Sequence, residues 1–240
     1  MNVLDTSFRL FFAPVLIAQA LAVRRQAQRL PEAEGPRSGT LGSGPLLRLG
    51  IVGDSSAAGV GVAEQSAALA GQLTQRLSTQ FTVTWALNAL SGATTKSTLA
   101  RLEKAQADPR DIIVIALGVN DATRLTSPKR WQRAQDALLA RLTTLYQPRL
   151  FIISGMPPLG TFPLLPQPLR WTLGRQAQKM EQQRVAWLNT RADCVHLPFV
   201  LDPDPELMAS DGFHPSATVY GIWAEMIAEA VRAHWSTDQR

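Results

Sequence analysis

Residues Asp111–Leu117 read DIIVIAL, and this stretch says most about the fold. A continuous apolar run of this length, rich in β-branched residues, predicts a strand that is buried on both faces, as in a parallel sheet. Other runs of the same kind are Leu46–Val52 (LLRLGIV), Phe81–Leu87 (FTVTWAL), Arg149–Ser154 (RLFIIS) and, more weakly, Cys194–Pro198 (CVHLP).

Helical spacing of apolar residues occupies the stretches between these strands. Residues Leu69–Leu77 carry a leucine at every fourth position, which places the leucines on one helix face. Ser127 followed by Pro128 is typical of a helix start, and two further helices are predicted at Arg170–Thr190 and Pro215–His234. The alternation predicts an α/β fold with an open parallel sheet of about five strands and helices on both faces.

Composition limits the class of protein. The chain has 240 residues, of which 45% are apolar and 18% charged, and this suits one domain with a large core. The single cysteine, Cys194, excludes an intramolecular disulfide and a zinc site built from cysteines. The net charge is +5, but the arginines are scattered, which favours an ordinary basic surface and no nucleic-acid partner.

The N-terminal segment Leu10–Val23 (LFFAPVLIAQALAV) is almost wholly apolar, yet shorter than the roughly 20 residues of a membrane-spanning helix. It is consistent with a signal-peptide core, a membrane-surface anchor or a helix docked on the domain. The string Ala18–Ala20 (AQA) resembles a cleavage site. However, Arg24, Arg25 and Arg29 follow the run, which favours a retained segment on the cytoplasmic side.

We therefore expect a protein that is cytoplasmic or peripheral to the inner face of a membrane, with possible membrane-surface association through residues 10–23. Export is the alternative, if residues 1–20 are a cleaved signal. Residues Leu30–Pro45 are rich in Gly, Pro and Ser, as in a linker. The expected organisation is an N-terminal apolar segment and linker, residues 1–45, followed by one folded domain, residues 46–240.

Polar residues follow the predicted strands, at the edge of the sheet where functional groups of such folds gather. They include a serine, a glycine, an asparagine and an Asp/His pair, found in Gly53–Ser56, Ser91–Gly92, Gly118–Asp121 and Asp211–His214.

This set is what acyl transfer requires. The hydroxyl of Ser55 needs a base to remove its proton, and the imidazole of His214 suits that role near neutral pH. Asp211 lies three residues earlier and can orient the ring. The backbone N–H groups of Ser55 and Gly92 and the side-chain amide of Asn120 would supply three donors to a developing oxyanion.

Two other interpretations of these serines stay open. Ser55 could cap the helix that follows the first strand, as serines in that position often do. The neighbouring Ser56 could be the reactive hydroxyl instead, because sequence alone separates adjacent serines poorly.

Four blocks in this order resemble those of the SGNH (GDSL-type) hydrolase family of esterases and lipases. The blocks are GDSS at 53–56, the glycine of LSGATT at Gly92, GVND at 118–121 and DGFH at 211–214, and the similarity covers roughly residues 46–234. Ser56 stands where the name-giving motif has leucine. The resemblance implies a flavodoxin-like three-layer α/β/α sandwich with about five parallel strands.

The same resemblance implies a role for each matching residue. Ser55 would be the nucleophile, His214 the base and Asp211 its orienting partner. Gly92 and Asn120 would join Ser55 in the oxyanion hole. No metal and no organic cofactor is expected.

Residues Met156–Trp171 (MPPLGTFPLLPQPLRW) form a loop that is longer than usual and contains five prolines. It could be a wall or lid that presents Leu159, Phe162 and Leu165, together with Leu164, to an acyl chain. A proline-stiffened loop packed on the surface is the alternative.

The expected function is that of a serine esterase that hydrolyses short- to medium-chain acyl esters or lysophospholipid-like substrates through an acyl-enzyme intermediate. Esterase action on acetylated carbohydrates, or acyl transfer at the same site, is the alternative within this class. A non-catalytic membrane-tethered binding module is the alternative from another class. A nucleotide-binding protein fits less well, because the loop after the first strand lacks the phosphate-binding Gly-x-x-x-x-Gly-Lys pattern.

Overall fold

The computed structural model describes residues 3–199 and 207–235, and their centre is a six-stranded sheet in the order β1-β3-β2-β4-β5-β6. The five strands from β2 to β6 run parallel to one another, which confirms the prediction of about five parallel strands. The strands are β1 (Ser38–Leu41), β2 (Leu46–Gly53), β3 (Thr82–Ala89), β4 (Ile112–Ala116), β5 (Leu150–Ser154) and β6 (Cys194–Leu197).

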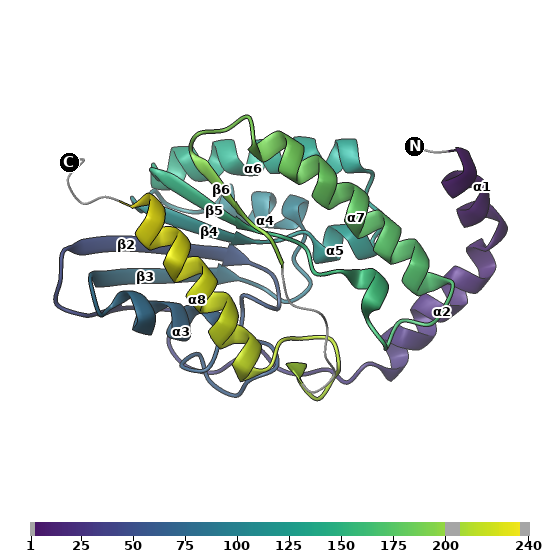
Figure 1. The fold of residues 1–240 in the computed structure, drawn as a ribbon, viewed down its shortest axis with the longest axis horizontal. Helices are drawn as coiled ribbons and strands as arrows, with labels where there is room; N and C mark the ends of the chain where they lie inside the picture. The colour runs from purple at the N-terminus through teal and green to yellow at the C-terminus, as the bar shows by residue number, and fades with distance from the viewer. Residues whose placement is uncertain (1–2, 200–206, 236–240) are drawn as a thin grey trace.

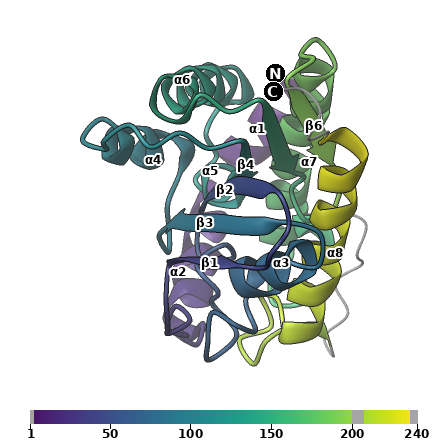
Figure 2. The ribbon, with the colours of Figure 1, turned by 90° about the vertical axis from the view of Figure 1, so that its left-hand side faces the viewer.

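Helices cover both faces of the sheet, so the three-layer α/β/α sandwich is also confirmed. Figure 2 shows α3 and α8 on one face and α4 and α6 on the other. The helices are α1 (Val3–Phe11), α2 (Ala13–Gln26), α3 (Leu69–Leu77), α4 (Thr95–Leu102), α5 (Val119–Thr123), α6 (Pro128–Tyr146), α7 (Leu169–Leu188), α8 (Ala217–His234) and the 3-10 turn η1 (Leu159–Thr161).

The core lies in two apolar layers, one on each side of the sheet. In β2, Leu49 and Ile51 face the layer under α3 and α8, whereas Val52 faces the layer under α4 and α6. This follows from the alternation of side chains along a strand. All five residues of β4 are buried, which explains why the sequence there is a continuous apolar run.

Strand β1 was not predicted from the sequence, where its residues belong to the expected linker. It pairs antiparallel with β3 at the edge of the sheet, with Ser38 opposite Ala86 and Leu41 opposite Val83. All four of its residues are exposed, so its sequence carries no apolar alternation from which a strand could be predicted.

The strand order creates a gap at the carboxyl ends of β2 and β4. After β2 the chain crosses to β3 on one side, and after β4 it crosses to β5 on the other, so the two following loops separate. Functional sites of open parallel sheets lie at such a switch point. The loop after β2 carries Ser55, and Asn120 lies in α5 directly after β4.

The N-terminal apolar segment packs on this same end of the molecule, beside η1 and the start of α7 (Figure 1). Leu16 of α2 is buried there, and the side chain of Gln19 donates to the carbonyl of Gln167 at 2.6 Å and accepts from the backbone N–H of Leu169 at 3.1 Å. Thus α2 is docked on the domain. None of the helices in the described ranges is long and apolar enough to cross a bilayer.

Candidate active site

A tight turn between residues 208 and 215 holds the predicted acid and base together. The backbone N–H of Ala209 donates to the carbonyl of His214 at 2.8 Å, and Oδ1 of Asp211 accepts the backbone N–H groups of Phe213 and His214, both at 3.0 Å. The other carboxylate oxygen, Oδ2, lies 2.5 Å from Nδ1 of His214. The turn therefore holds the imidazole at Nδ1 and leaves Nε2, on the other side of the ring, to face another residue.

Ser55 lies in the loop that follows β2, and this loop is held against α8. The buried hydroxyl of Tyr220 donates to the carbonyl of Val60 at 2.8 Å. Gly61 has φ +109°, and a Cβ at this position would lie 2.4 Å from the carbonyl oxygen of Pro215. Glycine thus permits the close approach of the two segments, which brings Oγ of Ser55 to 2.8 Å from Nε2 of His214.

These contacts form a continuous chain from hydroxyl to imidazole to carboxylate. Burial alone would raise the pKa of Asp211, but hydrogen bonds from the His214 backbone, the His214 ring and the Phe213 backbone outweigh it and lower the pKa below its ordinary value. The charged carboxylate can hold the proton on Nδ1, which leaves Nε2 able to accept the proton of Ser55.

The two alternatives for the serines can be compared with this geometry. The hydroxyl of Ser56 donates to Oδ1 of Asp54 at 2.8 Å, so it is directed at a different carboxylate from the one beside His214. The next helix, α3, begins only at Leu69, so Ser55 does not cap it.

Asp54 is a buried carboxylate directly beneath this loop. Burial raises its pKa, against the opposing effect of hydrogen bonds from Ser56. Its Oδ2 lies 3.4 Å from Nδ2 of Asn120, so it joins the loop after β2 to the start of α5. The side-chain amide of Asn120 also donates to the carbonyl of Ala93 at 3.1 Å. Asn120 is therefore anchored close to Ser55, at the strand-order switch point.

Gly92, the third expected oxyanion donor, lies in the turn after β3, next to Ala93. Its φ of +76° is strained for other residues, and a Cβ at this position would meet no atom within 4 Å. The backbone conformation, rather than crowding, therefore accounts for glycine here.

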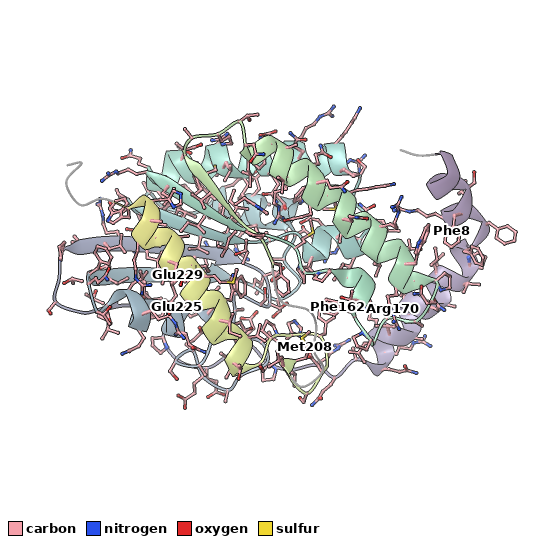
Figure 3. All side chains as sticks on the ribbon, in the orientation of Figure 1. Phe8, Phe162, Arg170, Met208, Glu225 and Glu229 are labelled. Atoms are coloured by element: carbon pink, nitrogen blue, oxygen red, sulfur yellow. The ribbon has the colours of Figure 1, made fainter. Side chains whose placement is uncertain are left out.

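An apolar pocket opens beside Ser55 and His214. Its walls come from the loops after β4 and β5, the turn between residues 208 and 215 and the first turns of α8. Figure 3 labels two of its residues, Phe162 and Met208. The large apolar residues of its lining are Leu117, Val119, Met156, Phe162, Phe199, Met208, Phe213, Val219 and Trp223.

Of the side chains in the long proline-rich loop that the sequence predicted as a wall for an acyl chain, only that of Phe162 lines the pocket. Its ring lies 5.3 Å from that of Phe213. Leu159 and Leu165, expected at the same wall, do not line it: both are buried in the apolar cluster between this loop, α2 and α7. Leu159 begins η1, and Leu165 lies four residues beyond its end. Leu164 is exposed and lies against Gly212.

Two residues near the site were missed as functional candidates. Trp223 of α8 lines the pocket, and its indole N–H donates to Oγ of Ser154 at 3.0 Å. Arg184 of α7 is fully buried and donates to the carbonyls of Leu117, at 2.7 Å, and Ser154, where β4 and β5 end. No sequence signal marks such a residue, because arginine is normally exposed.

Comparison with known proteins agrees with this geometry. The profile of the GDSL-like Lipase/Acylhydrolase family matches residues 51–222, most of the chain. The chain belongs to this family. This membership confirms the resemblance seen in the four sequence blocks and makes the protein a GDSL-type esterase or acylhydrolase. A curated member, the GDSL-like esterase Rv1075c of Mycobacterium tuberculosis, is 30% identical over 224 residues, which cover 84% of this chain and 69% of the relative.

Several solved structures, esterases among them, share the fold. The structure of TesA has a TM-score of 0.61 at 22% identity and covers 78% of this chain and 98% of its own. The psychrotrophic esterase EstA from a Pseudoalteromonas species has a TM-score of 0.60 at 18% identity, with coverage of 78% and 97%. Axe2, an acetylxylan esterase from Geobacillus stearothermophilus, has a TM-score of 0.55 at 18% identity, with coverage of 83% and 99%.

Proposed function

We propose that Ser55, His214 and Asp211 are the catalytic triad of this GDSL-type esterase and that it hydrolyses carboxylic esters through an acyl-enzyme intermediate. The observation that carries the proposal is the 2.8 Å contact between Oγ of Ser55 and Nε2 of His214, with Asp211 on the opposite ring nitrogen. This is the arrangement that activates a serine hydroxyl.

In the first half-reaction, Oγ of Ser55 attacks the ester carbonyl carbon while Nε2 of His214 takes the hydroxyl proton. Asp211 stabilises the resulting imidazolium. The tetrahedral intermediate collapses, the ester C–O bond breaks, and the alcohol leaves with the proton from His214. In the second half-reaction, His214 deprotonates a water molecule that attacks the acyl-enzyme, and the acid is released as Ser55 regains its proton.

The negative oxygen of each tetrahedral intermediate would accept hydrogen bonds from the backbone N–H groups of Ser55 and Gly92 and from Nδ2 of Asn120. Nδ2 carries two protons, and its contacts are 3.1 Å to Ala93 and 3.4 Å to Asp54. We infer that the longer contact is exchanged for the oxyanion, while the shorter one keeps the amide in place.

The apolar pocket supports acyl groups rather than sugars as the part of the substrate bound most deeply. Rings and thioethers such as Phe162, Trp223 and Met156 offer dispersion contacts and few hydrogen bonds. Short- to medium-chain acyl esters or lysophospholipid-like molecules therefore fit best. An acetylated carbohydrate, or an alcohol acceptor in an acyl-transfer reaction, would use the same catalytic residues.

The interaction partners that we propose are a small-molecule or lipid ester and a membrane surface, but no nucleic acid. Positive charge in the last turn of α2, at Arg24 and Arg25, favours the cytoplasmic side or the inner face of a membrane as the location.

A fluorophosphonate probe and a chain-length series would test the function. The full chain is expected to label at Ser55 and to hydrolyse p-nitrophenyl esters, while Ser55→Ala should do neither. An absence of both labelling and hydrolysis in the parent protein would instead favour the non-catalytic binding module. Transfer of the acyl group from a p-nitrophenyl ester to an added alcohol, in preference to hydrolysis by water, would identify an acyltransferase.

A further inference from the structure

Between Ala13 and Val23, helix α2 carries apolar residues at every position except Gln19, but the domain covers only one of its sides. On the inner side, Phe12, Leu16 and Val23 pack into the cluster formed with α7 and η1. A helix that is apolar on all sides is normally buried on all sides. We therefore expect a second surface to cover the outer side of α2.

The outer side carries large exposed side chains. Ile17 is 60% exposed and Leu21, one turn later, is 48% exposed. Phe11, the last residue of α1, is 80% exposed. Residues one turn apart lie on the same helix face, so Ile17 and Leu21 form one patch, here called the outer patch (Ile17 and Leu21). Within the described ranges, no part of the chain covers it.

Positively charged residues follow the outer patch toward the C-terminal end of α2. Arg24 and Arg25, in the last turn of α2, and Arg29 just beyond it are exposed, and none forms an ion pair in the part of the chain that the structure describes. No Asp or Glu occurs between residues 6 and 31. A surface that is both apolar and negatively charged would complement the outer patch and these arginines together.

We propose that α2 binds the surface of an anionic lipid membrane through its outer patch, with Arg24, Arg25 and Arg29 on the lipid headgroups. Apolar side chains beside basic residues are the combination by which interfacial helices enter the headgroup region. The helix has 14 residues, or about 21 Å at 1.5 Å per residue, so it lies on the membrane rather than crossing it.

Docking in this way would bring the membrane close to the acyl pocket. The inner side of α2 packs on the cluster that contains Phe162, and Phe162 lines the pocket. Leu164, two residues later, is 48% exposed, and a Cβ placed on Gly212, in the turn that holds Asp211 and His214, would lie 3.0 Å from its side chain. The membrane would then supply a lipid ester directly to the pocket, a consequence that rests on the proposed function, whereas the docking itself does not.

Vesicle flotation with the full chain would test the docking. The probes are vesicles of phosphatidylcholine alone and vesicles that contain about 30 mol% phosphatidylglycerol, the anionic surface that attracts basic residues. We expect the parent protein to bind the anionic vesicles. Ile17→Gln with Leu21→Gln should weaken that binding at least about tenfold, because two large side chains lose their apolar contact.

The charge contribution has its own variant. Arg24→Gln with Arg25→Gln should weaken binding to the anionic vesicles roughly 25-fold, or about fivefold for each charge. Arg130→Gln with Arg133→Gln lowers the net charge equally on exposed positions of α6 and should change binding less than about twofold. Leu41→Gln with Ile222→Gln is the matched control for exposed apolar residues.

The outcomes separate docking from catalysis. Ser55→Ala should still float with the vesicles although it has lost hydrolysis, and the α2 variants should keep parent rates on soluble p-nitrophenyl acetate. Equal vesicle binding by the parent and the Ile17/Leu21 variant would overturn the docking proposal. So would a dimer in light scattering that this variant makes monomeric, without vesicle binding by the parent, because the outer patch would then be covered by a second copy.

Discussion

The hydroxyl oxygen of Ser55 lies 2.8 Å from Nε2 of His214, although 159 positions separate the two residues along the chain. Two contacts hold their segments together independently of this hydrogen bond: the buried hydroxyl of Tyr220 on the carbonyl of Val60, and the close passage of Gly61 beneath Pro215. Because these supports do not involve the reacting atoms, substitutions at Ser55 and His214 should leave the scaffold in place.

Replacing Ser55 by alanine should lower hydrolysis of p-nitrophenyl acetate by at least about 10³-fold, because the attacking oxygen is lost. Thermal unfolding should change little, since the hydroxyl contacts only the part-buried His214 ring. Ser56→Ala is the matched control: its hydroxyl bonds to Asp54, so labelling of Ser55 by a fluorophosphonate should persist. A Ser55→Ala protein with the parent rate would refute the mechanism.

Asp211→Asn should reduce the rate roughly 10²–10⁴-fold, because an amide can hold the imidazole in the wrong tautomer. The Oδ1 contacts with the backbone N–H groups of Phe213 and His214 can persist in the variant, so the turn should remain folded. The check is kcat at saturating ester together with the circular dichroism spectrum. A full rate in the folded variant would exclude Asp211 as the orienting group.

The lowered pKa of Asp211 also predicts a dependence of stability on pH. Its folded-state pKa lies below the unfolded value of about 3.9, so its ionisation stabilises the fold above that pH. This contribution is lost as the pH falls through the folded-state pKa. Urea unfolding between neutral and acid pH should therefore show a smaller acid-induced loss of stability for Asp211→Asn than for the parent. An equal loss would contradict the inferred shift.

Asn120→Ala should lower kcat by roughly 10²–10³-fold with a smaller change in KM, because an oxyanion donor acts in the transition state more than on the bound ester. The control is Asn189→Ala, which removes an exposed amide at the end of α7. An increase in KM at constant kcat would indicate that Asn120 binds the substrate rather than the oxyanion.

Phe162→Ser should reduce hydrolysis of octanoyl esters more than hydrolysis of acetyl esters. The ring lines the pocket, and each methylene contact in an apolar pocket contributes about 1–3 kcal/mol. Leu164→Ser, two residues away and exposed, should leave the selectivity for soluble esters unchanged. Equal losses on both esters for Phe162→Ser would show that the ring supports the turn that holds Asp211 and His214 instead of the acyl chain.

Arg184→Met should destabilise the fold by about 3–5 kcal/mol, because it leaves the carbonyls of Leu117 and Ser154 and the carboxylate of Glu181 without their buried cation. Arg232→Met removes a more exposed partner of Glu225 and should cost less than about 1 kcal/mol. Denaturant unfolding measures both. Similar small losses would mean that water replaces Arg184 at the strand ends.

Much of the fold could be predicted because its signals are local. The buried parallel strands are short apolar runs. The strand at Ile112–Ala116 is buried at every position, so it can be predicted from its own residues alone. The pairing of Asp211 with His214 also depends on a turn of four residues. By contrast, all four residues of β1 are exposed, and the strand pairs with β3 through its backbone and a contact between the hydroxyls of Thr40 and Thr84, for which its sequence has no apolar pattern.

By itself, the sequence determined the α/β class, the family and the identity of the residues that can perform acyl transfer, because each depends on residue type and short-range spacing. Tertiary structure decided which of them meet. The close approach of Ser55 to His214, the inward packing of Leu159 and Leu165 while Phe162 faces the pocket, and the burial of Arg184 depend on contacts between segments far apart in the chain. Such contacts arise from the packing of whole helices and strands, so they cannot be predicted from the short-range spacing of residues.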